Sequence, residues 1–220
     1  MARRNRNRQS LARRGPQREP YDRVLIVCEG EKTEPHYFRE MIATWQLSGT
    51  NVEIRGDGGS APNSVVEYAV QLFEQSPDYD RVYCVFDKDG HASFAAAVQR
   101  VRDLTLLRME GKTELGSAHF EAITSVPCFE YWVLLHFNYT TSPMARFANV
   151  RSRLRRCEGL ANYDKGRSGL FSLTEPKLDA ALANADRANR QASDTGTDNP
   201  TTQMPSLIRY LRELAQNKNS

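Results

Sequence analysis

Acidic residues follow two hydrophobic, strand-like segments of this 220-residue chain. Glu29 follows the run Val24–Cys28, and Asp87 and Asp89 follow the run Val82–Phe86. In a parallel α/β sheet, ligands and catalytic groups gather at the carboxyl ends of the strands. Three carboxylates that meet there need a cation, because a buried unpaired charge is costly, and oxygen ligands select hard ions such as Mg²⁺ or Mn²⁺. The spacing therefore predicts a metal centre suited to phosphoryl chemistry on nucleic acid.

Strand-like and helix-like segments alternate through the first half of the chain. Val24–Cys28 is short, apolar throughout and rich in β-branched residues, as expected of a buried parallel strand. A helix is predicted to begin near Thr33, with Pro35 in its first turn. Further strands are predicted over 51–55, 82–86 and 120–126, and further helices over 63–75 and 93–104. This alternation predicts an α/β fold, with a mainly parallel sheet and helices on both faces.

The second half of the chain is predicted to contain helices only. Their periodicity places them over 129–137, 144–156, 173–191 and 205–216, with a polar linker over 192–200. We therefore expect an α/β core over residues 21–127 and a mainly helical C-terminal part over 128–220 that packs on this core.

Positive charge is concentrated at the N-terminus. Residues 1–18 contain seven arginines and no acid, so the net charge of +3 becomes −4 without them. This composition predicts a disordered basic tail over 1–20, whose arginines either bind nucleic-acid phosphates or only keep the chain soluble. No apolar run approaches the ~20 residues that span a membrane, and the start lacks the apolar segment of a signal peptide. We expect a cytoplasmic protein with no membrane partner.

Each acidic motif also has a simpler structural interpretation. Glu29 with the glycine after it fits a turn, and Asp87-Lys88-Asp89-Gly90 fits a helix cap with a turn. The functional interpretation is favoured, because both strand ends carry an acid close to a glycine. Glu130 is predicted to be a fourth metal ligand delivered by the strand before it, although the helix dipole alone favours glutamate there. Glu34 is interpreted as an ordinary charge in the first turn of a helix.

A glutamate after one strand and an Asp-x-Asp after a later strand resemble the toprim fold, the metal-binding domain of topoisomerases, primases and nucleases. More specifically, the chain resembles RloB-like proteins, which are bacterial proteins encoded near restriction and abortive-infection loci. The resemblance covers residues 21–215 and rests on the runs VLIVCEGEKTEPHYF, VYCVFDKDGH, SVPCFEYWVLLHF, YDK and NPTTQMPSLI. Val126 stands where the family usually has an asparagine, which weakens any role for that side chain and leaves Glu130 in place.

The resemblance implies a toprim-like, Rossmann-like core and a Mg²⁺-dependent nuclease of phage defence, often encoded beside an ATPase partner. Glu29, Asp87 and Asp89 would then be both metal ligands and catalytic residues. Lys165, in the YDK run, would stabilise charge on the reacting phosphate. Without the resemblance, Lys165 would be interpreted as an ordinary surface lysine. The remaining candidates are basic residues that would contact nucleic-acid phosphates: Lys32, Arg153 and Arg156.

The predicted mechanism uses one or two ions at the scissile phosphate, with Glu29 as a ligand or, instead, as a general acid or base. Two other functions fit part of the sequence. Asp87 could open the motif of a haloacid-dehalogenase-like phosphatase, although His91 and the earlier strand with Glu29 are unusual for that class. Alternatively, the chain is a non-catalytic module that binds nucleic acid or a partner. The residues leave open whether the polymer is tRNA, other RNA or DNA, and they predict no oligomeric state.

Overall fold

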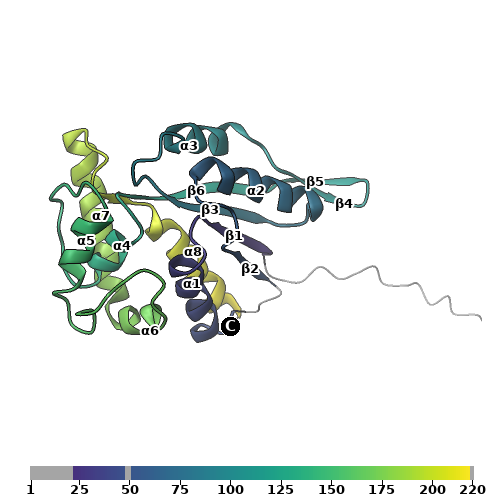
Figure 1. Cartoon of the computed structure of the whole chain (residues 1–220). Helices are drawn as coiled ribbons and strands as arrows, with labels where there is room; N and C mark the ends of the chain where they lie inside the picture. The colour runs from purple at the N-terminus through teal and green to yellow at the C-terminus, as the bar shows by residue number, and fades with distance from the viewer. Residues whose placement is uncertain (1–21, 48–50, 219–220) are drawn as a thin grey trace, which may run out of the picture.

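A five-stranded sheet in the order β2-β1-β3-β6-β7 forms the centre of the chain (Figure 1). The computed structural model describes residues 22–47 and 51–218. Four strands are parallel: β1 (Val24–Cys28), β2 (Val52–Arg55), β3 (Arg81–Asp87) and β6 (His119–Val126). β7 (Thr201–Thr202) pairs antiparallel with the end of β6. The predicted α/β fold with a mainly parallel sheet is confirmed.

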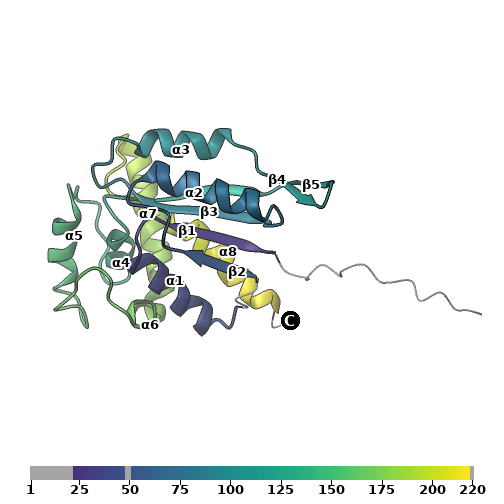
Figure 2. The ribbon, with the colours of Figure 1, turned by 45° about the vertical axis from the view of Figure 1, so that its right-hand side comes forward.

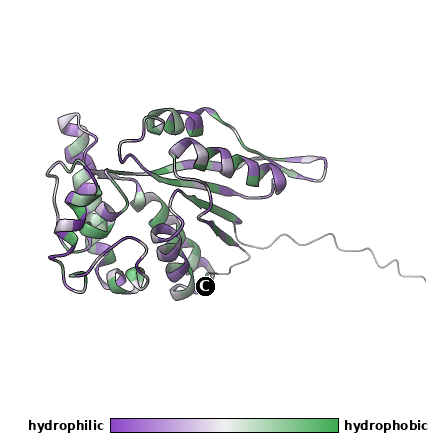
Figure 3. Cartoon of the chain, in the orientation of Figure 1, coloured by the Kyte–Doolittle hydropathy of each residue, from purple (hydrophilic) through white to green (hydrophobic). Residues whose placement is uncertain are grey.

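Helices cover both faces of the sheet (Figure 2). α2 (Pro62–Gln75) and α3 (Phe94–Asp103) pack on one face, and α1 (Thr33–Thr44) and α8 (Met204–Lys218) pack on the other. Alternate side chains of β1 enter the two cores, so this strand is buried on both sides. Such a strand must be apolar throughout, and β1 is accordingly drawn in hydrophobic colours (Figure 3).

The C-terminal helices extend the core on the α1 side of the sheet. α4 (Glu130–Leu135), α5 (Phe147–Leu154), α6 (Leu170–Thr174) and α7 (Leu178–Thr195) bury side chains in the same cluster as α1. A shared core fixes these helices relative to the sheet, because close-packed side chains resist displacement.

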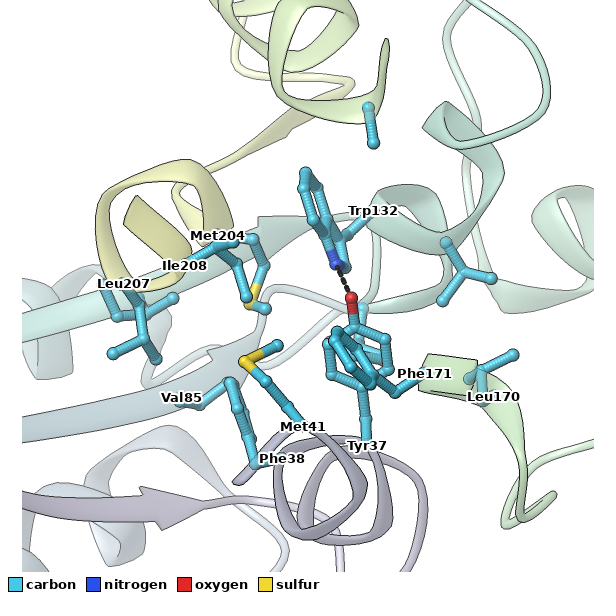
Figure 4. Packing of buried hydrophobic residues seen from close by; sticks show 14 of the residues in the cluster. Tyr37, Phe38, Met41, Val85, Trp132, Leu170, Phe171, Met204, Leu207 and Ile208 are labelled. Carbon is cyan, nitrogen blue, oxygen red and sulfur yellow. Dashed lines mark hydrogen bonds between the residues drawn. The ribbon is translucent and has the colours of Figure 1, made fainter. Parts of the chain in front are cut away.

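Tyr37 of α1 lies at the meeting point of these helices (Figure 4). The Trp132 indole N–H of α4 donates to the Tyr37 hydroxyl at 3.0 Å. The Phe171 ring of α6 stands edge-on to Tyr37, with the ring centroids 5.3 Å apart. Met204 of α8 joins the same cluster (Figure 4). These contacts hold α4 and the start of α6 against α1, and thereby position the chain segments that carry Glu130 and Lys165.

Three segments form strands that the sequence analysis does not predict. β4 (Leu107–Glu110) and β5 (Thr113–Ser117) make an antiparallel hairpin before β6. Most of the hairpin's side chains are exposed, so it lacks the apolar alternation that marks a buried strand. The prediction that only helices follow Val126 is wrong, because β7 adds a short strand to the sheet.

The helices after β6 are shorter or differently divided than predicted. α4 ends at Leu135 rather than at 137, and α5 spans 147–154 rather than 144–156. The predicted helix over 173–191 is three elements: α6, a 3₁₀ helix, η1 (Glu175–Lys177), and α7. Pro176 in η1 has no backbone N–H to donate, so an unbroken α-helix is unfavourable there. α7 continues to Thr195, into the segment predicted as a linker.

The basic tail predicted over residues 1–20 lies outside the described residues. Within 22–47 and 51–218, none of the helices combines the length and the apolarity that crossing a bilayer would require.

Candidate active site

A cleft of about 770 Å³ opens at the carboxyl edge of the sheet, where β1 and β3 end. Cys28 at the end of β1 pairs with Val85 of β3, so the turn after β1 and the end of β3 reach the same edge. The structure thus places three acids predicted from the sequence in one cleft. The charged side chains of its lining include Glu29, Glu34, Asp57, Asp87, Asp89 and Lys165.

Glu29, directly after β1, contacts the end of β3 and the loop beyond it. Glu29 Oε2 accepts a hydrogen bond from the Asp87 backbone N–H at 3.0 Å, and Glu29 Oε1 lies 3.0 Å from His91 Nε2. The next residue, Gly30, allows a second carboxylate to approach, because a Cβ at this position would overlap Glu34 Oε2. The Glu-Gly turn therefore brings two acidic side chains to the cleft.

Two carboxyl groups of the cleft are buried and interact with a third. Asp87 and Glu34 are each 8% exposed. Burial raises the pKa of Asp87 well above its usual range, and the charges of Glu34 and Glu130 raise it further. Burial, and then the charge of Glu130, also raises the pKa of Glu34 to about 7. Burial and neighbouring negative charge thus disfavour the ionised forms of Asp87 and Glu34, so the site favours either bound protons or a cation.

Glu130, at the start of α4, is the most deeply buried acid of the group, with 1% exposure. Its Oε1 accepts a hydrogen bond from the Tyr163 hydroxyl at 3.2 Å. Among the described residues, its Oε2 has no hydrogen-bond partner. A buried polar atom without a partner is unfavourable, so a ligand that paired with this oxygen would stabilise the protein.

This donor set fits a hard divalent cation. Carboxylate oxygens are the ligands that Mg²⁺ and Mn²⁺ prefer. A bound cation would reduce the repulsion between the carboxylates and would pair with the unpartnered oxygen of Glu130. In the part of the chain that the structure describes, no three Asp, Glu, His or Cys side chains have the arrangement of a metal site. Both oxygens of Glu29 have protein partners. Glu29 would therefore have to share or exchange its His91 contact in order to bind an ion.

The comparisons with known proteins give one match. The sequence model of a family described as RloB-like protein matches residues 24–211. The chain belongs to the RloB-like protein family. No curated protein and no solved structure matches the chain in these comparisons. The resemblance noted from the sequence is confirmed, and the matched range of this RloB-like chain contains every residue of the cleft.

Lys165 supplies positive charge to the cleft. Burial disfavours the charged ammonium, but the negative charges of Glu130 and Asp87 outweigh this effect and raise the pKa of Lys165. The loop around it has little space, since Gly166 has a positive φ of 81° and a Cβ there would crowd the Lys32 side chain. Lys32 lines the cleft as well. Both lysines are thus placed where an anionic ligand of the cleft would lie.

The loop that carries Lys165 is tied to α1 by its backbone N–H groups. Gly166 N–H donates to Thr33 Oγ1 at 2.8 Å, and Phe171 N–H donates to Glu40 Oε2 at 2.9 Å. Gly169 N–H donates to the other Glu40 oxygen. These three hydrogen bonds connect the loop to the helix that also carries Glu34. The position of Lys165 therefore depends on Thr33 and Glu40, which do not need to touch a substrate.

The other predicted site residues lie at the rim of the cleft or beyond it. Asp89 is exposed and lines the cleft. Arg153 on α5 donates to Thr140 Oγ1 at 2.8 Å, and Arg156 is exposed just after α5. Neither arginine lines the cleft. The structure brings Glu29, Asp87, Asp89, Lys32 and Lys165 together, and it places the two arginines on a neighbouring surface.

Sequence reasoning missed the importance of two residues. Glu34 does lie in the first turn of α1, as predicted, but it is buried among the acids rather than exposed. The signal in the sequence was its spacing, because Glu34 lies four residues before a buried aromatic residue and therefore on the same face of the helix. Tyr163 is fully buried and donates to Glu130. The YDK run contains this tyrosine, but nothing local connects it to an acid 33 residues away.

Proposed function

We propose that this RloB-like protein is a divalent-metal-dependent nuclease that hydrolyses phosphodiester bonds of nucleic acid. The observation that supports this proposal is the convergence of Glu29, Asp87 and Asp89, with Glu34, in one cleft at the carboxyl edge of a parallel sheet, next to the buried Glu130. Acids in a cleft whose pKa is raised by burial and by neighbouring charges, as for Asp87 and Glu34, mark a functional site better than a structural one. The adjacent lysines suit an anionic substrate.

The proposed roles follow from position and charge. Glu29, Asp87, Asp89 and Glu130 would hold the ion, and a bound Mg²⁺ or Mn²⁺ supplies Lewis-acid polarisation of a phosphoryl oxygen. Lys165 places positive charge near the phosphate, where negative charge increases in the transition state. Three further residues orient these groups, namely the buried Glu34 and Tyr163 and the partly exposed His91.

Incubation with three polymers tests the proposal. Purified protein is mixed with total tRNA, single-stranded RNA or plasmid DNA, with Mg²⁺, with Mn²⁺ or with EDTA. We expect cutting of at least one polymer with metal and none with EDTA. Tight binding without cutting would instead indicate a non-catalytic module. Metal-dependent hydrolysis of an aryl phosphate, without strand cutting, would indicate a phosphatase.

Lys165→Ala is expected to lower the cutting rate about a hundredfold, because it removes one fixed positive charge from the site of the transition state. Single-turnover cutting rates of the variant and the wild type measure this effect. Lys165→Arg keeps the charge and is the matched control, expected to retain more activity than the alanine variant. Equal rates for Lys165→Ala and the wild type would remove Lys165 from the mechanism.

Glu40→Ala is expected to slow cutting about ten- to a hundredfold, because it releases two of the three hydrogen bonds that hold the Lys165 loop. The decisive comparison is the double variant. If Glu40 acts only through Lys165, Lys165→Ala with Glu40→Ala will cut no more slowly than Lys165→Ala alone. Additive losses would show that Glu40 acts elsewhere. Glu40→Gln keeps one acceptor oxygen and should be intermediate.

The proposed biological setting comes from the family resemblance. We infer a cytoplasmic nuclease of bacterial phage defence, with an ATPase encoded nearby as a regulatory partner. Co-expression with such an ATPase, followed by the same polymer assay, tests the partner. An ATPase that neither binds this protein nor changes its cutting would contradict that part of the proposal.

A further inference from the structure

Positive charge is concentrated in a segment of the chain that reaches the acidic cleft at Lys165. Between residues 144 and 167 the chain has seven basic side chains and only two acidic ones. Of the seven, only Arg151 forms an ion pair with a carboxylate of the described residues, at 3.5 Å from Asp164. The Arg151–Asp164 pair is partly exposed and therefore weak, so a phosphate can compete for Arg151, and the other six side chains have no described carboxylate to release. The seven residues are Arg146, Arg151, Arg153, Arg155, Arg156, Lys165 and Arg167.

An aromatic ring lies among these cations. Phe147 is the first residue of α5, and its ring packs against the core on one side and stays partly exposed. The Lys165 ammonium is 4.8 Å from the ring centroid, and the Arg151 guanidinium carbon is 5.4 Å from it. Both side chains are long and flexible, so either can move aside for a ligand. An aromatic ring with mobile cations next to it is suited to a nucleotide, whose base stacks while its phosphates pair with the cations.

Phe147 lies at the mouth of the proposed active site. Lys165 both lines the cleft and contacts the Phe147 ring, so the two places adjoin. A nucleotide next to a phosphate held in the cleft would therefore meet this ring. In a duplex the bases are paired and stacked on one another, and a side chain reaches their faces only where the strand is unpaired.

We propose that Phe147, Arg151 and Lys165 form a nucleotide subsite that stacks one unpaired base of the substrate beside the cleft. This inference rests on the proposed nuclease function and defines its substrate class as a single-stranded segment of nucleic acid. The Phe147 ring stacks on the base, Arg151 pairs with a flanking phosphate, and Lys165 is released toward the phosphate in the cleft.

Binding measurements without cutting test the subsite. Asp87→Asn protein in EDTA is titrated into fluorescently labelled single strands, as RNA and as DNA, and into the matching duplexes. Phe147→Leu keeps an apolar side chain for the core but has no aromatic face, and Phe147→Tyr keeps the face. We expect Phe147→Leu to weaken single-strand binding about tenfold, and Phe147→Tyr to leave it nearly unchanged. Duplex binding should not respond to either substitution.

A set of single strands, each with one abasic site at a different position, distinguishes a loss of base stacking from an indirect effect of the substitution on Lys165. When the abasic site is at one particular position, the strand should bind weakly to the protein that has Phe147. The Phe147→Leu substitution should then cause no further loss of affinity. Equal binding by Phe147→Leu and Phe147→Tyr, or a loss that no abasic position removes, would overturn the subsite.

These results do not depend on whether the protein cuts. Phe147-dependent binding in a protein that cuts no polymer, either alone or co-expressed with the ATPase, would keep the subsite and refute the proposed function. Metal-dependent cutting in a protein whose single-strand binding does not depend on Phe147 would refute the subsite alone.

Discussion

Asp87→Asn is expected to abolish metal-dependent cutting and, at the same time, to make the metal-free protein more stable. The raised pKa of Asp87 means that its ionised form is unfavourable in the folded chain. Asparagine removes that charge and keeps an acceptor oxygen for the Phe129 backbone N–H. We expect the cutting rate to fall by a factor of about 10³ or more, and the melting temperature at pH 8 in EDTA to rise by about 2–6 °C.

Asp89→Asn is the matched control for this pair of effects. Asp89 lies two residues further along the chain but is exposed, so water can solvate its side chain. Asp89→Asn should lose cutting and leave the metal-free melting temperature unchanged. A folded Asp87→Asn protein that still cuts, or that melts at a lower temperature than the wild type in EDTA, would contradict the proposed role of Asp87.

Stability of the metal-free protein is expected to fall between about pH 4.5 and pH 7 because of Glu34. The pKa of Glu34 is raised from 4.5 to about 7 in the folded chain, so the folded state holds a proton that the unfolded state has lost. The contribution is fully present below pH 4.5 and is lost as the pH rises through 7. The shift corresponds to about 3 kcal/mol of unfolding free energy.

Glu34→Gln separates the contribution of Glu34 and its effect on Asp87 from that of more distant titrating groups. Burial lowers the pKa of His136 to about 4, which makes stability rise with pH over part of the same range. The difference between wild type and Glu34→Gln cancels this effect. Urea unfolding in EDTA should show similar stabilities at pH 4.5, and a variant that is more stable by about 3 kcal/mol at pH 8. A difference in unfolding free energy that does not change with pH would contradict the raised pKa of Glu34.

The sheet was predictable because burial on both faces leaves a strong pattern in the sequence. The segment Val24–Cys28 matches β1 at both ends, since every residue of it is buried. β7 left no such pattern, because it has two residues and depends on pairing with β6, far away in the sequence. There Ser125 Oγ lies 3.0 Å from Thr202 Oγ1, a contact across 77 residues that local periodicity does not encode.

The acids at strand ends were also predictable, since the topology alone brings Glu29 and Asp87 to one edge. The contacts and burial of these acids could not be predicted from the sequence. Glu34 has the same local sequence features as an exposed acid in a first helical turn, and its pKa is raised only because the fold buries it close to the charge of Glu130. Glu40 likewise reads as a surface residue of α1, until the distant loop of Lys165 is found to donate to it. Such contacts depend on how α1, α4 and α6 pack together.

Calorimetric titration of metal-free protein with Mn²⁺ at pH 8 tests most directly whether these carboxylates form a metal centre. We expect the wild type to bind Mn²⁺ and Asp87→Asn to bind it at least about tenfold more weakly, because a ligand is lost from the buried cluster. The absence of Mn²⁺ binding by the wild type, or equal binding by wild type and Asp87→Asn, would contradict the proposed metal centre.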